Sequence, residues 1–122
     1  MLYCGKGERG VTACENALVA TGFPYEIASR VDEILERMRP VLSSCQGVRR
    51  CGAAALDLAW TACGRFDAFY EDELKPWDMA AGALLVTEAG GSISNLDGSP
   101  FDLRWSILAG NKAMHELIGK MI

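Results

Sequence analysis

The segment "LKPWDMAAGALLVTEAGG", residues 74–91, decides the fold of this chain of 122 residues. A long run of small and apolar residues follows Asp78 and ends at Gly90 and Gly91, which predicts a buried helix from about Asp78 to Ala89. Aspartate at a helix start can cap the free backbone N–H groups. The same carboxylate can bind a metal ion through its other oxygen, so capping and metal binding remain open for Asp78.

Strand and helix patterns alternate on both sides of this segment. The expected strands are residues 17–22, 45–50, 65–71, 92–96 and 105–110, and the expected helices are residues 25–38, 52–64, 78–89 and 111–122. The first of these helices is amphipathic and is expected to stop near Pro40. The order β-α-β-α-β-α-β-β-α predicts an α/β domain, in which helices cover a layered, mostly buried sheet.

Domain organisation is simple at the level of sequence. Residues 1–16 are rich in glycine and polar side chains without a clear period, and we expect them to be the least ordered part of the chain. Residues 17–122 contain no linker or repeat and are expected to form one domain.

The composition excludes several classes of protein. Half of the residues are hydrophobic and 23% are charged, as in an ordinary folded domain. The net charge is −4 and the longest basic run is Arg49-Arg50, so a nucleic-acid partner is not expected. No apolar run has the length of a bilayer span, and the N-terminus lacks the apolar region of a signal peptide. We therefore predict a cytoplasmic protein that does not insert into a membrane.

The five cysteines are Cys4, Cys14, Cys45, Cys51 and Cys63. Their number is odd and none of them form a C-x-x-C pair, so we interpret them as reduced thiols. Zinc binding or a disulfide is the less favoured alternative.

Three places in the chain could bind a ligand. Gly52, Ala53 and Ala54 begin a predicted helix, where unpaired N–H groups and small side chains admit an anion such as phosphate; close packing of helix on sheet is the simpler explanation. Glu71 ends a predicted strand, and open α/β sheets bind ligands beyond strand ends. Asp78 is the third candidate.

Other polar side chains are expected to have no part in such a site. Asp72 and Glu73 follow Glu71 and are expected to form a solvated acidic loop. His115 is the only histidine. It has no serine or cysteine placed near it in the sequence, so we expect a surface role rather than catalysis.

Residues 64–98, "GRFDAFYEDELKPWDMAAGALLVTEAGGSISNLDG", and the upstream "GAAALDLAWTACG" closely resemble the carboxyl-terminal half of the inositol monophosphatase family. The pattern W-D-x-A-A-G-x-L-L-x-x-E-A-G-G is the second signature of that family. The resemblance extends over about residues 17–122. It implies the mixed sheet with helices of the carboxyl-terminal subdomain of that fold.

The resemblance also implies a function. Members are Mg²⁺-dependent phosphatases that hydrolyse small phosphomonoesters of inositol and related sugars, and they often form dimers. Asp78 matches the aspartate that ligates a metal ion. Gly52, Ala53 and Ala54 match the helix start that lines the substrate site, and Glu71 matches the acid that hydrogen-bonds the sugar ring.

The chain departs from the family in its metal ligands. An upstream glutamate and a D-P-[LI]-D-G-T signature supply the other ligands in the family, and neither occurs here. One aspartate cannot assemble a site for several metal ions, so Mg²⁺ binding by this chain alone is expected to be weak or absent. We therefore expect an incomplete portion of a phosphatase, completed by an amino-terminal half. The alternative is a catalytically inactive module that binds a sugar phosphate or forms a homo-oligomer.

Overall fold

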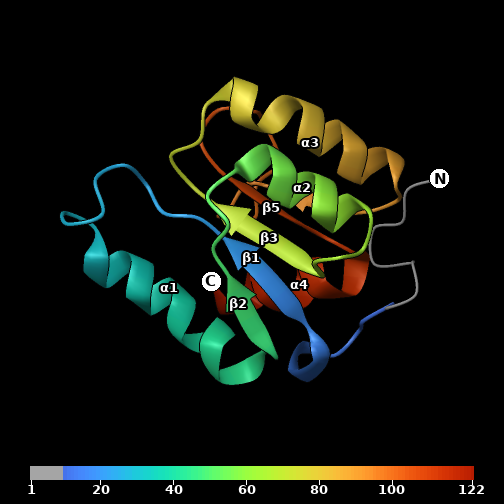
Figure 1. Ribbon diagram of the computed structural model, residues 1–122, viewed down its shortest axis with the longest axis horizontal. Coiled ribbons are helices and arrows are strands. Elements are labelled where there is room, and N and C mark those ends of the chain that lie inside the picture. Colours follow the sequence, from blue (N-terminus) through green and yellow to red (C-terminus); the bar gives the residue numbers. More distant parts are fainter. Residues whose placement is uncertain (1–9) are drawn as a thin grey trace.

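The computed structural model describes residues 10–122, which fold into an α/β structure around one five-stranded sheet (Figure 1). The strands lie in the order β2-β1-β3-β5-β4. The elements are the 3₁₀ helix η1 (Cys14–Asn16), β1 (Leu18–Thr21), α1 (Val31–Ser44), β2 (Gly47–Arg49), α2 (Ala54–Ala62), β3 (Ala68–Glu71), α3 (Pro76–Glu88), β4 (Ser92–Ser94), β5 (Ile107–Gly110) and α4 (Lys112–Met121). This order of strands and helices confirms the predicted order.

The sheet is mixed, as expected. β1 runs parallel to both of its neighbours, β2 and β3, while β5 runs antiparallel to β3 and β4. Parallel neighbours need a crossover, and α1 and α2 provide the connections between β1, β2 and β3. The carboxyl ends of β1 and β3 consequently lie at the same edge of the sheet, with Thr21 paired to Tyr70 in register.

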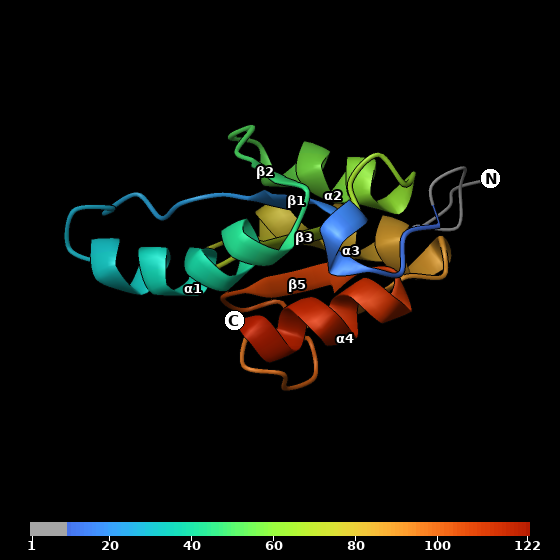
Figure 2. The same cartoon turned by 90° about the horizontal axis from the view of Figure 1, so that it is seen from below.

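Alternating side chains divide the core into two layers, one on each face of the sheet. Ala20 and Phe69 face the layer formed with α2 and α3, whereas the preceding Val19 and the following Tyr70 face the layer formed with α1 and α4. Figure 2 shows α2 on one side of the strands and α1 and α4 on the other. The two-residue period of a strand therefore produces a buried sheet, because both faces are apolar.

Both ends of the first predicted helix differ from the prediction by several residues, and the ends of the other three helices differ by one or two. The first helix is α1, which begins at Val31 rather than Tyr25 and continues through Pro40 to Ser44. Proline has no N–H to donate within the helix, but its φ is compatible with helical backbone. The last turn is retained because it places Val41, the one buried side chain of α1, in the core.

The segment 1–16, expected to be the least ordered part of the chain, lies only partly within the described residues. Residues 1–9 lie outside the described residues, and Cys14–Asn16 form the short helix η1. Within residues 10–122, no helix combines the length and the apolar character needed to cross a membrane.

Candidate functional site

An open pocket of about 430 Å³ lies where the starts of α2 and α3 meet the end of β3. The loop that follows β1 forms its outer wall. The pocket is lined by Phe23, Pro24, Tyr25, Ile27, Arg50, Gly52, Ala53, Ala54, Glu71, Leu74 and Asp78. The structure thus brings together all of the site residues that the sequence predicts.

The start of α2 exposes backbone rather than side chain to the pocket. Ala54 is the first helical residue, and Ala53 at the N-cap has no side chain that could accept a hydrogen bond. Gly52 has a φ of +86°, a left-handed conformation that favours glycine. The first N–H groups of α2 are therefore accessible to an anion or a hydroxyl group.

Glu71 is a half-buried carboxylic acid at the end of β3. Burial, followed by the negative charge of Asp57, raises the pKa of Glu71 to about 7, while Arg50 opposes this rise. A side chain at Gly22 would overlap this carboxyl group, because a Cβ there would lie 2.0 Å from Glu71 Oε1. Glycine at position 22 therefore leaves the space that Glu71 occupies. Near neutral pH this group can donate or accept a hydrogen bond.

Asp78 is placed differently from the predicted N-cap. The helix begins two residues earlier, so Asp78 is the third helical residue and Lys75 is the N-cap. Asp78 Oδ2 accepts the Lys75 backbone N–H at 2.9 Å. The prediction of an N-cap is wrong because Pro76 takes the first helical position, for which its fixed φ is suited. Capping of the helix by this carboxylate is nonetheless observed, and it leaves the second oxygen available.

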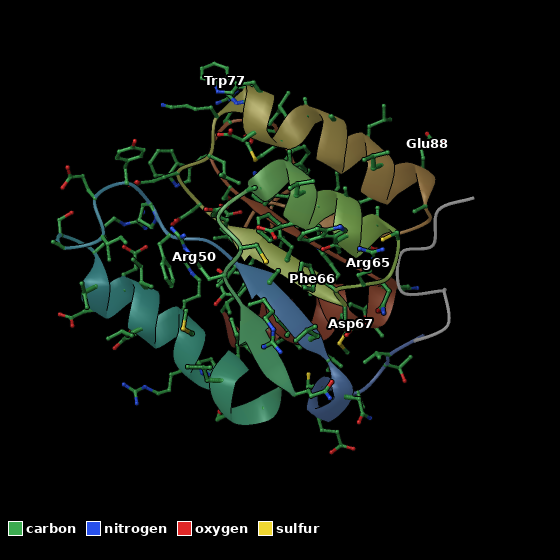
Figure 3. All side chains as sticks on the ribbon, viewed as in Figure 1. Arg50, Arg65, Phe66, Asp67, Trp77 and Glu88 are labelled. Atoms are coloured by element: carbon green, nitrogen blue, oxygen red, sulfur yellow. The ribbon has the colours of Figure 1, made fainter. Side chains whose placement is uncertain are left out.

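Arg50 was missed by the sequence reasoning. It carries the one positive charge among the residues that line the pocket in the described part of the chain. Its guanidinium carbon lies 5.5 Å from the centre of the Phe23 ring, over the loop that follows β1. Figure 3 shows Arg50 beside this loop. The signal in the sequence was its position immediately before Cys51 and Gly52, at the entrance to a predicted helix.

The acidic loop after Glu71 is not solvated, contrary to the prediction. Asp72 is 7% exposed, and its Oδ2 lies 2.7 Å from Arg30 Nη2 and 3.2 Å from Arg37 Nη1. Glu73 lies 3.0 Å from Arg30 Nη1. The two arginines belong to the distant α1 region, so their pairing with the loop could not be seen in local sequence. These acids anchor α1 and do not line the candidate pocket.

His115 also has a partner that the sequence does not reveal. Its Nε2 lies 2.8 Å from Ser94 Oγ, and Ser94 in turn donates to the Asn95 carbonyl at 2.9 Å. Burial lowers the pKa of His115. The pair links β4 to α4, and neither residue lines the candidate pocket.

The described residues do not form a magnesium site by themselves. Residues 10–122 contain no group of three or more His, Cys, Asp or Glu side chains that could hold a metal ion. Asp78 offers one carboxylate, of which one oxygen already accepts a hydrogen bond. Mg²⁺ requires near-octahedral oxygen ligands and usually binds one or two carboxylates together with water and phosphate. Asp78 fits one ligand position of such a site and no more.

Comparison with protein families gives a match to the inositol monophosphatase family over residues 4–122. The chain belongs to this family. Two similar curated proteins are the inositol-1-monophosphatase of Caulobacter vibrioides, 45% identical over 106 residues, and the Nus factor SuhB of Pseudomonas aeruginosa, 49% identical over 105 residues. The matches cover 85% and 84% of this chain, but 41% and 39% of those proteins. The chain therefore spans about two-fifths of the length of these family members.

Solved structures of family members have the same fold. The inositol monophosphatase of Anabaena (Nostoc) sp. PCC 7120 superposes with a TM-score of 0.85 at 37% identity, covering 91% of this chain and 44% of that one. The SuhB protein of Bartonella henselae gives a TM-score of 0.85 at 39% identity, covering 91% and 43%. The predicted family and fold class are confirmed. A phosphatase role fits the chain at the level of the family.

Proposed function

We propose that this chain supplies the substrate-binding part and one metal ligand of a Mg²⁺-dependent phosphatase that acts on small inositol or sugar phosphomonoesters. The observation that carries the proposal is the single pocket shared by the start of α2, Glu71 and Asp78. The family and the name of the Caulobacter relative support the same substrate class. The remaining metal ligands would come from a second portion of the site.

The polar groups that line the pocket would bind different parts of the substrate. The accessible N–H groups at Gly52, Ala53 and Ala54 donate to substrate oxygens, and Arg50 adds a positive charge near the phosphate. Glu71 would hydrogen-bond a ring hydroxyl of the substrate. Because its pKa is about 7, it can do so either as a donor or as an acceptor.

Asp78 is the residue we assign to the metal ion. Its hydrogen bond from Lys75 fixes the carboxylate at the first turn of α3 and leaves the other oxygen for Mg²⁺. A bound divalent ion would supply Lewis acidity toward the phosphate and an activated water. The described residues alone do not hold it, so we assign no catalytic step to this chain by itself.

A complementation experiment tests the proposal. The chain is mixed with the part of the Caulobacter inositol-1-monophosphatase that it does not match, together with Mg²⁺ and inositol 1-phosphate, and phosphate release is measured. We expect release from the mixture and none from the chain alone. Asp78→Asn should reduce release by about 100-fold or more. Asp32→Asn, in the exposed first turn of α1, is the matched control and should leave it unchanged.

Absence of phosphate release from every mixture would remove the catalytic proposal. Calorimetric titration of the chain with inositol 1-phosphate then tests the alternative, an inactive module that binds a sugar phosphate. Heat of binding without phosphate release would identify that module.

Self-association is a further part of that alternative. Leu56, Trp77 and Leu84 on α2 and α3 are large apolar side chains with more than half of their surface exposed, and Trp77 points away from the molecule (Figure 3). Such a surface favours an apolar partner, including a second copy of the chain. A monomeric mass in light scattering at concentrations well above micromolar would exclude the homo-oligomer.

A further inference from the structure

Two cysteines far apart in the sequence meet on the face of the sheet opposite α2 and α3. Cys14 belongs to η1, and Cys45 is the C-cap of α1. Both side chains pack against the same apolar cluster, which contains Val19 and Val41. Figures 1 and 2 both show η1 beside the end of α1. Neither cysteine lines the candidate pocket.

Backbone pairing holds the two cysteines in place. The Gln46 N–H donates to the Ala17 carbonyl at 3.0 Å, and the next residues, Leu18 and Gly47, pair in the parallel register of β1 and β2. The backbone of each cysteine is also fixed, since Ala17 N–H donates to Cys14 O and Cys45 N–H donates to the last turn of α1. These contacts bring the Cys45 thiol beside the Cys14 thiol, close enough for the two groups to interact.

The other two described cysteines have different surroundings. The Cys63 thiol donates to the Trp60 carbonyl at 3.4 Å. Cys51 is exposed and lies near the carboxylate of Asp57. All four are free thiols in the structure, and Cys14 and Cys45 are the two that pack against the same apolar cluster.

We propose that Cys14 and Cys45 form an oxidation site, at which hydrogen peroxide converts the two thiols to one disulfide. In the first step the Cys14 sulfur attacks peroxide, the O–O bond breaks, and a sulfenic acid and one water form. In the second step the Cys45 sulfur attacks the Cys14 sulfur, the S–O bond breaks, and a second water leaves with the Cys45 proton. Two thiols lose two electrons in total, and one peroxide accepts them.

The order of the two steps follows from the environment of each thiol. Burial, with the nearby Cys14 and Asp67 adding to it, raises the pKa of Cys45 to about 11, so this thiol stays protonated near neutral pH and reacts poorly with peroxide. Cys14 is half-buried, as Cys45 is, so exposure does not order the two thiols; because Cys45 stays protonated, we assign the attack on peroxide to Cys14. Because backbone pairing already holds the partner thiol nearby, formation of the disulfide competes well with further oxidation of the sulfenic acid.

The disulfide would connect the site's outer wall to the rest of the fold. The closed loop runs from Cys14 to Cys45 and contains β1, α1 and the segment 23–27 that lines the candidate pocket. A cross-link of this kind restricts the unfolded chain, and we expect the melting temperature of the oxidised protein to rise by about 5–10 °C.

Tryptic mapping of the full chain tests the proposal directly. Cys14 lies in the peptide 10–30 and Cys45 in the peptide 38–49, whose internal Arg-Pro bond resists trypsin. Peptide 51–65 carries both of the other described cysteines. After treatment with about one equivalent of hydrogen peroxide and alkylation of the remaining thiols, we expect a cross-linked species of 10–30 with 38–49. Dithiothreitol should release both peptides.

Matched serine variants separate this pair from the other cysteines. Cys14→Ser and Cys45→Ser should each abolish the cross-link and the rise in melting temperature, whereas Cys63→Ser should retain both. Circular dichroism of the reduced variants checks that each is folded. A cross-link from Cys4 or from peptide 51–65 in place of the expected one would overturn the proposal. Recovery of the wild-type peptides 10–30 and 38–49 without any link between them would overturn it as well.

Discussion

On one face of the sheet, α2 and α3 pack so closely that Gly82 lies against the Leu58 side chain; on the other face, α1 buries Val41 alone. The close pair positions the starts of two helices beside the end of β3, which is where the candidate pocket lies. The α1 region is held instead by ion pairs from Arg30 and Arg37 to Asp72. Rigid packing thus fixes the polar groups of the site, and charge pairs position its outer wall.

The largest expected difference between the two regions is in the free energy of unfolding that is lost when a leucine is replaced by alanine. Leu58 on α2 is 0% exposed and Leu42 on α1 is 57% exposed. Leu58→Ala leaves a cavity in the core and should lower the free energy of unfolding by about 3 kcal/mol. Leu42→Ala should change it by less than about 0.5 kcal/mol. Urea denaturation measures both, and equal losses would refute the contrast in packing.

The charge of Glu71 gives a contrast that depends on pH. The pKa of Glu71 is about 7 in the folded chain and 4.5 in the unfolded chain. The folded state therefore holds the proton more tightly, and the free energy of unfolding falls as the pH rises from 4.5 through 7. Glu71→Gln removes that loss. When the pH is raised from 5 to 8, we expect the free energy of unfolding of the variant to increase by about 1–2 kcal/mol relative to that of the wild type. This value is smaller than the full pKa shift implies, because the side chain is partly exposed to solvent.

Urea denaturation at both pH values provides the measurement for Glu71. Glu88→Gln, at the exposed far end of α3, is the matched control and should show no such gain. A gain of the same size in both variants would trace the effect to net charge rather than to burial of Glu71.

The close approach of α2 and α3 can be tested at Gly82. A Cβ at this position would lie 2.4 Å from Leu58 Cβ, so Gly82→Ala forces the helices apart and should cost about 1–2 kcal/mol despite the better helix propensity of alanine. Gly119→Ala on α4 is the matched control, because its Cβ would meet the movable end of Leu108 at 3.3 Å. Thermal melting should show the first variant destabilised and the second nearly unchanged or slightly stabilised.

The smallest expected effect concerns the ion pairs that hold α1. Asp72→Asn removes the charge that Arg30 and Arg37 share, and we expect a loss of about 1 kcal/mol at low salt that shrinks at high salt. Asp102→Asn breaks an exposed contact of 3.7 Å to Arg104 and should cost less than about 0.3 kcal/mol. If Asp72→Asn changes the free energy of unfolding as little as Asp102→Asn does, the ion pairs do not hold α1.

The order of elements could be predicted from the sequence because each depends on local periodicity and on nearby glycine and proline. The same reasoning placed the end of α1 at Pro40, although the helix continues to Ser44. Local sequence does not record that Val41 gains more by entering the core than the helix loses at the proline. The boundary was therefore decided by tertiary packing.

The candidate site shows the same division. The sequence by itself determined the chemistry that these segments offer: small residues at a helix start, Glu71 after a strand, and Asp78 near the start of the next helix. Only the tertiary structure decided that these groups share one pocket, that Arg50 joins them, and that Asp72 faces arginines instead of solvent. The physical reason is that residue type and local backbone preference act over a few positions, whereas burial and charge pairing depend on segments that meet only after the chain has folded.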